Sequence, residues 1–350
     1  MDPANTLLIE PEGKLHGSHV TPTDHAYFWH DQVPVWRQSG AAGPFVSPYD
    51  VRAPASGIIT QSEQFTFRPT PYGFTGVVRD YPMDIWHSCS LSSILIHLGG
   101  LAPEILDVTG DIPEGSSWFL QRSGNPVVVE AGQIIGKVGS VGFDYSLHDT
   151  DMVLTGFVDP SRYDREPWKV HTVDFYEYFE EPVRLQLLTM NPRTVAPLGG
   201  QIDYDIDGRL VRNGFLDGTT GHGDGSTGSD YWSAHLSIAY DYIDPTQIRV
   251  PIGAPTGIGE EQCQVCLGVY GVKNNGPNIG DITADAGLVI YKLVARERTD
   301  GSRVLTHNVD SEVFGLFLVQ MMDERTIKME VIAGAADVHA FSDAATIYHR

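Results

Sequence analysis

The chain has 350 residues, of which 41% are hydrophobic, and its formal net charge is -22. This length predicts about two domains, and the apolar content is sufficient for a buried core in each. So acidic a chain repels phosphate backbones, and we therefore expect no nucleic-acid partner. We also expect no membrane span, because the longest apolar run, 313–319, is too short to cross a bilayer.

The apolar residues at 7–9 do not form a signal-peptide core. We therefore expect an extracytoplasmic protein if an export signal has been removed, and a cytoplasmic one otherwise. The sequence leaves the oligomeric state open. Three cysteines are too few for a disulfide framework, and Cys263 and Cys266 form either a local disulfide or two buried thiols.

The first half of the chain reads as short strands between turns. Residues 1–50 are predicted to be irregular, with one aromatic patch at 27–29. The stretch 127–139 predicts two strands joined by a tight turn at Ala131-Gly132. Further strands are predicted at 51–60, 74–80, 93–98 and 144–154.

Residues 160–190 are the best helical region, because aromatic and aliphatic residues recur there at three- and four-residue steps. Pro182 prevents one continuous helix over 173–188. The predicted organisation is a first domain at 1–160, a helical linker at 161–194 and a second domain at 195–350.

The second half is predicted to be all β. Residues 201–210 alternate apolar and acidic side chains, which is typical of a half-buried strand. Asp300-Gly301 is a strong hairpin signal, and 323–325 is a second turn. Further strands are predicted at 235–242, 264–272, 288–296, 303–307, 314–322 and 326–331. Short strands at this spacing indicate an antiparallel barrel or sandwich.

A cluster of possible metal ligands lies near the N-terminus. His19, Asp24 and His25 stand within seven residues, and imidazole and carboxylate are both good zinc ligands. The alternative is a loop in which these side chains bond to nearby backbone. More distant histidines, His97 and His148, favour the metal site.

Two glycine-containing elements, at 51–57 and 129–139, suggest close approach of backbones. Biotinyl and lipoyl carrier domains have similar elements, but they need a modified Lys between them, and no Lys occurs there. The order of motifs over residues 15–155 resembles the lysostaphin-type M23 zinc endopeptidases. That order is His19 and Asp24, then APASG at 53–57, IHL at 96–98, AGQIIGKVG at 131–139 and SLH at 146–148.

The resemblance implies a mostly β, M23-like barrel domain with a duplicated hybrid motif and a Zn²⁺ ion. His19, Asp24 and His148 would be the ligands, and His97 would assist the water or stabilise the oxyanion. Three protein ligands leave one position open, where zinc lowers the pKa of bound water to about 7. The implied activity is hydrolysis of a peptide bond, in a peptide or cell-wall substrate such as a cross-bridge.

This sequence departs from the family pattern in three ways. His19 and Asp24 are five residues apart rather than four, so His25 or His16 could replace one of them. Ser146 stands where the family has a catalytic His, and Asp149 adds an alternative carboxylate. The second hypothesis is therefore an inactive relative that acts as a binding, envelope-associated or assembly module.

The C-terminal half resembles an uncharacterised β-rich domain. Its segment GRLVRNGF at 208–215 resembles small-ligand β-barrels of the lipocalin kind. This third hypothesis predicts an apolar cavity inside the second domain.

Overall fold

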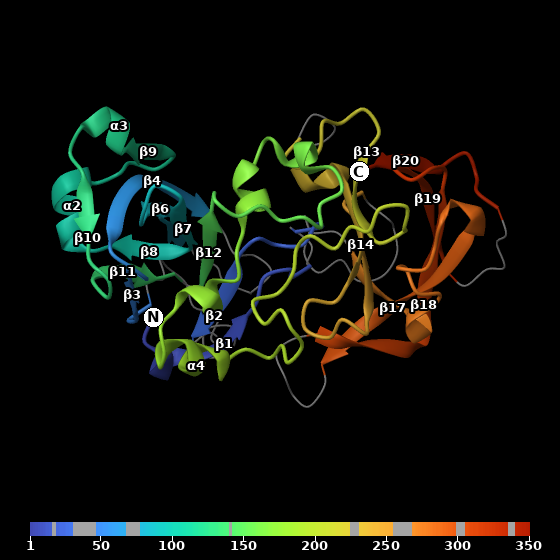
Figure 1. Cartoon of the computed structure of the whole chain (residues 1–350), viewed down its shortest axis with the longest axis horizontal. Helices are drawn as coiled ribbons and strands as arrows, with labels where there is room; N and C mark the ends of the chain where they lie inside the picture. The colour runs from blue at the N-terminus through green and yellow to red at the C-terminus, as the bar shows by residue number, and fades with distance from the viewer. Residues whose placement is uncertain are drawn as a thin grey trace. The chain divides into compact units, whose positions relative to one another are not determined.

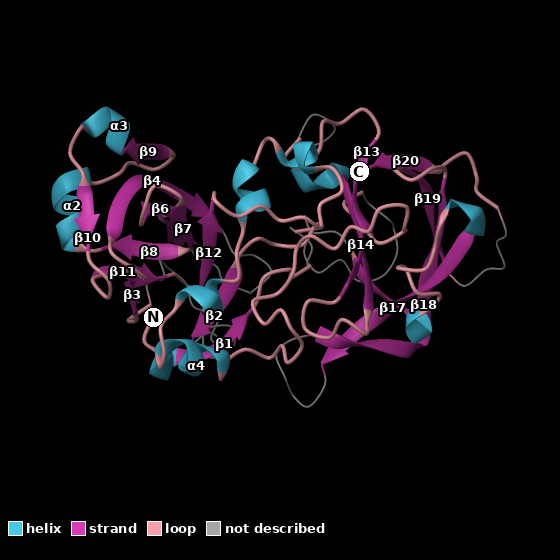
Figure 2. Cartoon of the chain, in the orientation of Figure 1, coloured by secondary structure: helices cyan, strands magenta, loops and turns pink. Residues whose placement is uncertain are grey.

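The structure is a computed structural model that describes residues 1–15, 19–30, 47–67, 78–139, 142–224, 231–254, 268–298, 305–334 and 340–350. The chain divides into two compact units, and each draws on several stretches of sequence (Figure 1). Strands dominate both units, as the sequence predicts (Figure 2). Unit 1 comprises Met1–Pro11, Asp24–Val153 and His171–Gly199, and unit 2 comprises Glu12–Thr23, Leu154–Val170 and Gly200–Arg350.

Unit 1 is built from two antiparallel sheets. Its described strands are β1 (Thr6–Glu10), β2 (Ala26–His30), β3 (Asp50–Arg52), β4 (Gly57–Phe67), β5 (Val78–Asp80), β6 (Met83–Trp86), β7 (Leu91–Ile96), β8 (Leu98–Leu101), β9 (Ser116–Phe119), β10 (Val127–Val129), β11 (Ile134–Val138) and β12 (Phe143–Asp149). Within this described part, a nine-stranded sheet has the order β1-β2-β12-β7-β6-β4-β10, with β5 and β9 also paired to β4. A three-stranded sheet has the order β3-β11-β8.

The helices of the described chain are short. They are η1 (Pro3–Asn5), α2 (Pro103–Thr109), α3 (Leu120–Ser123), η3 (Pro160–Tyr163), η4 (Pro167–His171), η5 (Phe175–Tyr178), α4 (Val183–Leu188), η6 (Tyr231–Ala234), η7 (Lys273–Asn275) and η8 (Ala284–Ala286). Most of the predicted helical region 160–190 is therefore single turns rather than long helix. The expected break is present, because α4 begins directly after Pro182, which cannot continue a helix from upstream.

One face of the nine-stranded sheet packs onto the core of unit 1. Successive side chains of a strand point to opposite faces, so every second residue can be buried against the same core. On β12, Phe143, Tyr145 and Leu147 belong to this core. The rings of Phe28 on β2 and Phe143 stack with centroids 4.8 Å apart. Aromatic contacts of this kind add to the free energy gained from burial.

Unit 2 contains a closed barrel of eight antiparallel strands among the residues that the structure places. The strands are β13 (Arg212–Leu216), β14 (His235–Tyr240), β15 (Ile248–Pro251), β16 (Val269–Val272), β17 (Val289–Arg298), β18 (Leu305–Met321), β19 (Thr326–Ala333) and β20 (Thr346–His349). Each strand pairs with its neighbour in sequence, and β20 pairs with β13 to close the barrel. The predicted barrel architecture is confirmed.

Large apolar side chains pack together in the barrel. Phe317 on β18 lies opposite Tyr291 on β17, and both are at most 1% exposed. Ile327 on β19 lies opposite Tyr348 on β20, and these two are equally buried. All four belong to one apolar cluster. Side chains can fill the interior of an eight-stranded barrel, so this packing weighs against the lipocalin-like ligand cavity, which stays a prediction.

Several sequence predictions need correction. Residues 1–50 are not wholly irregular, because β1 and β2 form an antiparallel pair there. The alternating stretch 201–210 contains no strand, and its acidic side chains bond to backbone instead, as Asp203 does with the Gly156 amide at 2.8 Å. By contrast, the two strands predicted in 127–139 and the turn at Ala131-Gly132 between them are confirmed, and the two strands join different sheets.

Other predictions are confirmed or lie outside the described residues. β17 pairs with β18 as the hairpin signal predicts, although Asp300 and Gly301 themselves are not described. Cys263 and Cys266 also lie outside the described residues. Among the helices that are described, none is long and apolar enough to span a membrane.

Replacing Phe317 tests the packed barrel. Phe317→Ala removes a fully buried ring, and we expect the free energy of unfolding of unit 2 to fall by about 3–5 kcal/mol because a cavity remains. Urea unfolding measures this change. Met322→Ala is the control, since Met322 is 52% exposed and should change stability by less than about 0.5 kcal/mol. Equal stability of the two variants would show that the interior is loosely filled.

Candidate functional site

The face of the nine-stranded sheet that points away from the core carries the candidate site. Because Tyr145 and Leu147 point into the core, the side chains between and beside them, Asp144, Ser146 and His148, point to the opposite face. On β2, Tyr27 lies opposite Asp144 and shares this face. The site therefore begins with polar groups that strand alternation places side by side.

His97 lies at the corner between β7 and β8. Its φ of 69° is in the left-handed region, which is uncommon for a residue other than glycine. The His97 amide donates a hydrogen bond to Asp80 Oδ1 at 2.9 Å, and the ring Nδ1 contacts Asp80 Oδ2. On its other side, the ring Nε2 lies 3.3 Å from Asp144 Oδ2. Both ring nitrogens are therefore engaged by carboxylates.

The surroundings of His97 determine its charge. Burial by itself disfavours the protonated ring, but the negative charges of Asp80 and Asp144 and their hydrogen bonds outweigh this effect and raise the pKa of His97 well above its ordinary value. At neutral pH the ring is therefore an imidazolium. An imidazolium has two N–H donors and no free lone pair, so His97 in this state can neither accept a proton nor bind a metal ion.

His25 extends the same network. Its Nδ1 lies 3.1 Å from Asp24 Oδ1, and its Nε2 lies 3.1 Å from the Tyr27 hydroxyl. The same Nε2 is 3.6 Å from Asp144 Oδ2, so Asp144 faces both histidines. Asp24, His25 and Asp144 are each at most 8% exposed. We call Asp24, His25, Asp80, His97 and Asp144 the histidine–aspartate network.

The structure brings together some of the residues that the sequence singled out. Asp24, His25 and His97 all belong to the network. His148 lies on the same face of β12 as Asp144 and is 2% exposed. Asp149 directly follows His148 on β12, so its side chain points to the opposite face of the sheet. Its Oδ2 accepts a hydrogen bond from the Tyr178 hydroxyl at 3.0 Å, and Asp149 does not join the network.

Two predicted residues, His19 and His16, are not tested as part of this site. His19 belongs to unit 2, whereas Asp24 and His148 belong to unit 1. His16 lies outside the described residues. The zinc ligand set of His19, Asp24 and His148 therefore stays a prediction.

Two members of the network were missed by the sequence reading. Asp144 could have been found, because it lies four residues before His148 and strand alternation places both on one face. No local pattern marks Asp80, since only the folding of β5 against the His97 corner brings its carboxylate to the ring.

The donors present match zinc by type but not by placement. Imidazole and carboxylate groups are suitable ligands. Among the described residues, however, no three His, Cys, Asp or Glu side chains are grouped so that they could hold a metal ion. The network as arranged does not fit a three-ligand zinc site, because its donor atoms bond to one another.

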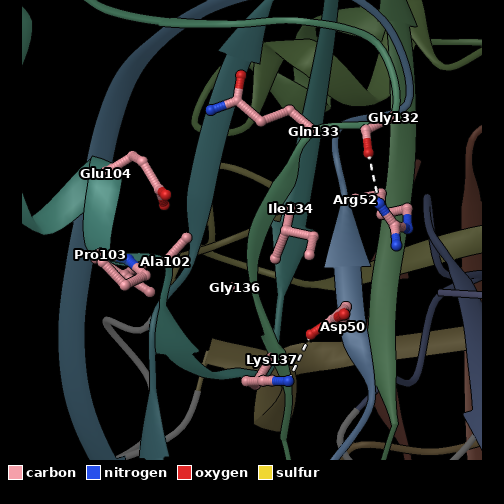
Figure 3. A pocket seen from close by; sticks show the side chains of 11 residues that line it. Asp50, Arg52, Ala102, Pro103, Glu104, Gly132, Gln133, Ile134, Gly136 and Lys137 are labelled. Atoms are coloured by element: carbon pink, nitrogen blue, oxygen red, sulfur yellow. Dashed lines mark hydrogen bonds and ion pairs between the residues drawn. The ribbon is translucent and has the colours of Figure 1, made fainter.

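A groove of about 570 Å³ lies elsewhere in unit 1 (Figure 3). It is lined by residues of β3 and β11 and by the junction of β8 and α2. Lys137 is paired with Asp50, and Arg52 Nη1 donates a hydrogen bond to the Gly132 carbonyl at 2.9 Å (Figure 3). The basic side chains are thus already bonded, and the lining contains no His or Cys.

Comparisons with known proteins add little to this description. No family model and no curated protein sequence matches the chain. A solved structure of a point mutant of the catalytic domain of the prophage-encoded M23 protein EnpA from Enterococcus faecalis is similar to it. The match has 15% identity, covers 40% of this chain and 77% of that one, and has a TM-score of 0.20. A TM-score this low carries no argument about the activity of this chain.

The charge of His97 predicts a pH-dependent contribution to stability. Its pKa is raised in the folded protein, so the stabilisation is fully present below the unfolded value of about 6.5 and is lost as the pH rises through the folded value. We expect His97→Gln to lower the free energy of unfolding most at pH 6 and progressively less at alkaline pH.

Urea unfolding of unit 1 between pH 6 and pH 10 measures this difference. The control is Val108→Ala, an exposed position on α2, which should give a small difference that does not change with pH. A constant loss in His97→Gln over the whole range would mean that the ring does not change charge differently in the folded and unfolded states.

Proposed function

We propose that unit 1 is a non-catalytic binding module. In this proposal the histidine–aspartate network stabilises the fold at the covered part of the sheet face and takes no part in a reaction. The observation that supports this most is the position of His97 between Asp80 and Asp144, where both ring nitrogens are engaged. A general base needs a free lone pair, and a charged ring has none. The network is also largely buried, as expected for a group that stabilises the fold.

The exposure of the sheet face indicates where a partner would bind. The face is covered at β12, where His148 is 2% exposed. It is open at β6, β4 and β10, where Trp86, Ile58 and Val128 are 38%, 39% and 64% exposed. Large apolar side chains on an open surface are typical of interaction sites. The open part of the face is therefore the proposed binding surface.

The alternative is the zinc metallopeptidase that the sequence resemblance implies. It requires His19, Asp24 and His148 to hold the metal and His97 to take part in hydrolysis of a peptide bond. The module and the peptidase predict different metal contents, so one measurement separates them.

Metal analysis of the purified full chain is that test. We expect substoichiometric zinc, because the donors of the histidine–aspartate network bond to one another, and we expect no change in metal content in His148→Ala or His19→Ala. The control is His171→Ala, a ring whose Nδ1 lies 2.7 Å from the Met152 carbonyl and takes no part in the network. A zinc-to-chain ratio near one that falls in His148→Ala but not in His171→Ala would establish the peptidase site instead.

A further inference from the structure

Three exposed apolar side chains form a continuous stripe across the open part of the sheet face. Val128 on β10 lies directly opposite Ile58 on β4, and Ile58 lies opposite Trp86 on β6. Residues directly opposite in an antiparallel pair have Cβ atoms about 5 Å apart and share a face. We call Val128, Ile58 and Trp86 the apolar stripe.

The stripe is in line with the buried part of the same face. Trp86 lies opposite Ser92 on β7, and Ser92 lies opposite His148 on β12. Strands are about 4.8 Å apart, so the open row from Val128 to Ser92 crosses three strand spacings, or about 14 Å, and it ends where His148 is buried. An extended chain rises about 3.3 Å per residue, so about four residues would cover the open row.

The carboxylate of Asp84 lies beside the stripe. Asp84 is two residues before Trp86 on β6, so its side chain is on the same face, opposite Gln61 on β4. No ion pair or hydrogen bond to the Asp84 carboxylate is found among the described residues. Burial and the nearby charge of Glu63 raise the pKa of Asp84 to about 6. A cation placed here would relieve this repulsion.

We propose that the apolar stripe and Asp84 together bind an extended peptide in which a basic residue stands beside apolar ones. This inference rests on the proposed function and specifies its ligand. Apolar side chains of the peptide pack on Trp86, Ile58 and Val128, and a Lys or Arg side chain reaches Asp84 and Glu63. The formal charge of -22 favours encounter with such a cationic partner.

The complementarity of charge decides between possible occupants. A second copy of this acidic chain would bring like charge to Asp84 and Glu63, and repulsion would oppose its docking. An uncharged apolar segment would cover the stripe but leave Asp84 without a partner. A basic and apolar peptide satisfies both features at once.

Calorimetric titration of the full chain with a capped hexapeptide of alternating Leu and Lys tests the proposal. We expect this peptide to bind, and we expect capped peptides of alternating Leu and Glu or alternating Ser and Lys to bind at least tenfold more weakly. Asp84→Asn should weaken binding of the Leu/Lys peptide about tenfold, because a charged hydrogen bond is lost.

Two further variants separate the stripe from apolar exposure in general. Val128→Ser should weaken binding about fivefold, because apolar contact area is lost from a position that the fold leaves 64% exposed. Ile134→Ser is the matched control, since Ile134 is 38% exposed but lies on β11 of the other sheet. This variant should bind the Leu/Lys peptide with unchanged affinity.

Each contrary outcome has a distinct meaning. Equal binding of the Leu/Lys and Leu/Glu peptides, with no effect of Asp84→Asn, overturns the assignment of a cationic ligand and leaves the binding module in place. Self-association of the chain that Val128→Ser abolishes assigns the stripe to a second copy and overturns the peptide proposal. The proposed function itself is judged separately, by the zinc content of the chain.

Discussion

An imidazolium held between two carboxylates connects the separate parts of the sheet in unit 1. Asp80 comes from β5, Asp144 comes from β12, and His97 lies at the corner between β7 and β8. Breaking a buried ion pair by removal of one partner is strongly destabilising, because the remaining charge has no compensation. The unusual backbone conformation of His97 is tolerated because its amide also bonds to Asp80.

The same interaction explains why the chemistry of the site differs from that of its residue types. A histidine beside two aspartates contains the donors of a metal or acid–base site. Once both nitrogens of His97 are engaged by carboxylates, the charged ring has no free lone pair for catalysis or metal binding. The proposed function instead places the partner on the open part of the sheet face, beside Trp86 and Asp84.

Unit 2 meets its structural requirements in a different way. An open sheet has edge strands with unpaired backbone groups, and closure of the barrel through β20 and β13 removes those edges. The interior then fills with side chains such as Phe317 and Tyr291. Charge also contributes in this unit, because Arg249 Nε lies 2.8 Å from Asp241 Oδ2 and both side chains are buried.

Local pattern was enough to predict the β class, most strands of the barrel and the two strands in 127–139, because a strand with one buried face shows itself as alternation within a few residues. The local cluster of possible ligands singled out His25, whereas His97 was singled out by the motif order that resembles the M23 family. The alternation of apolar and acidic residues at 201–210 wrongly predicted a strand. The acidic side chains there bond to backbone amides instead of facing solvent from a strand.

The partners of the histidines were decided only by tertiary structure. Asp80 and His97 are 17 residues apart in sequence, and Asp144 is far from both, so no spacing rule connects them. The grouping of His19 with unit 2 and of Asp24 with unit 1 was likewise invisible in a segment of six residues. Residue types and their periodicity are properties of short stretches, whereas the charge state and reactivity of a side chain depend on the atoms that the whole fold places around it.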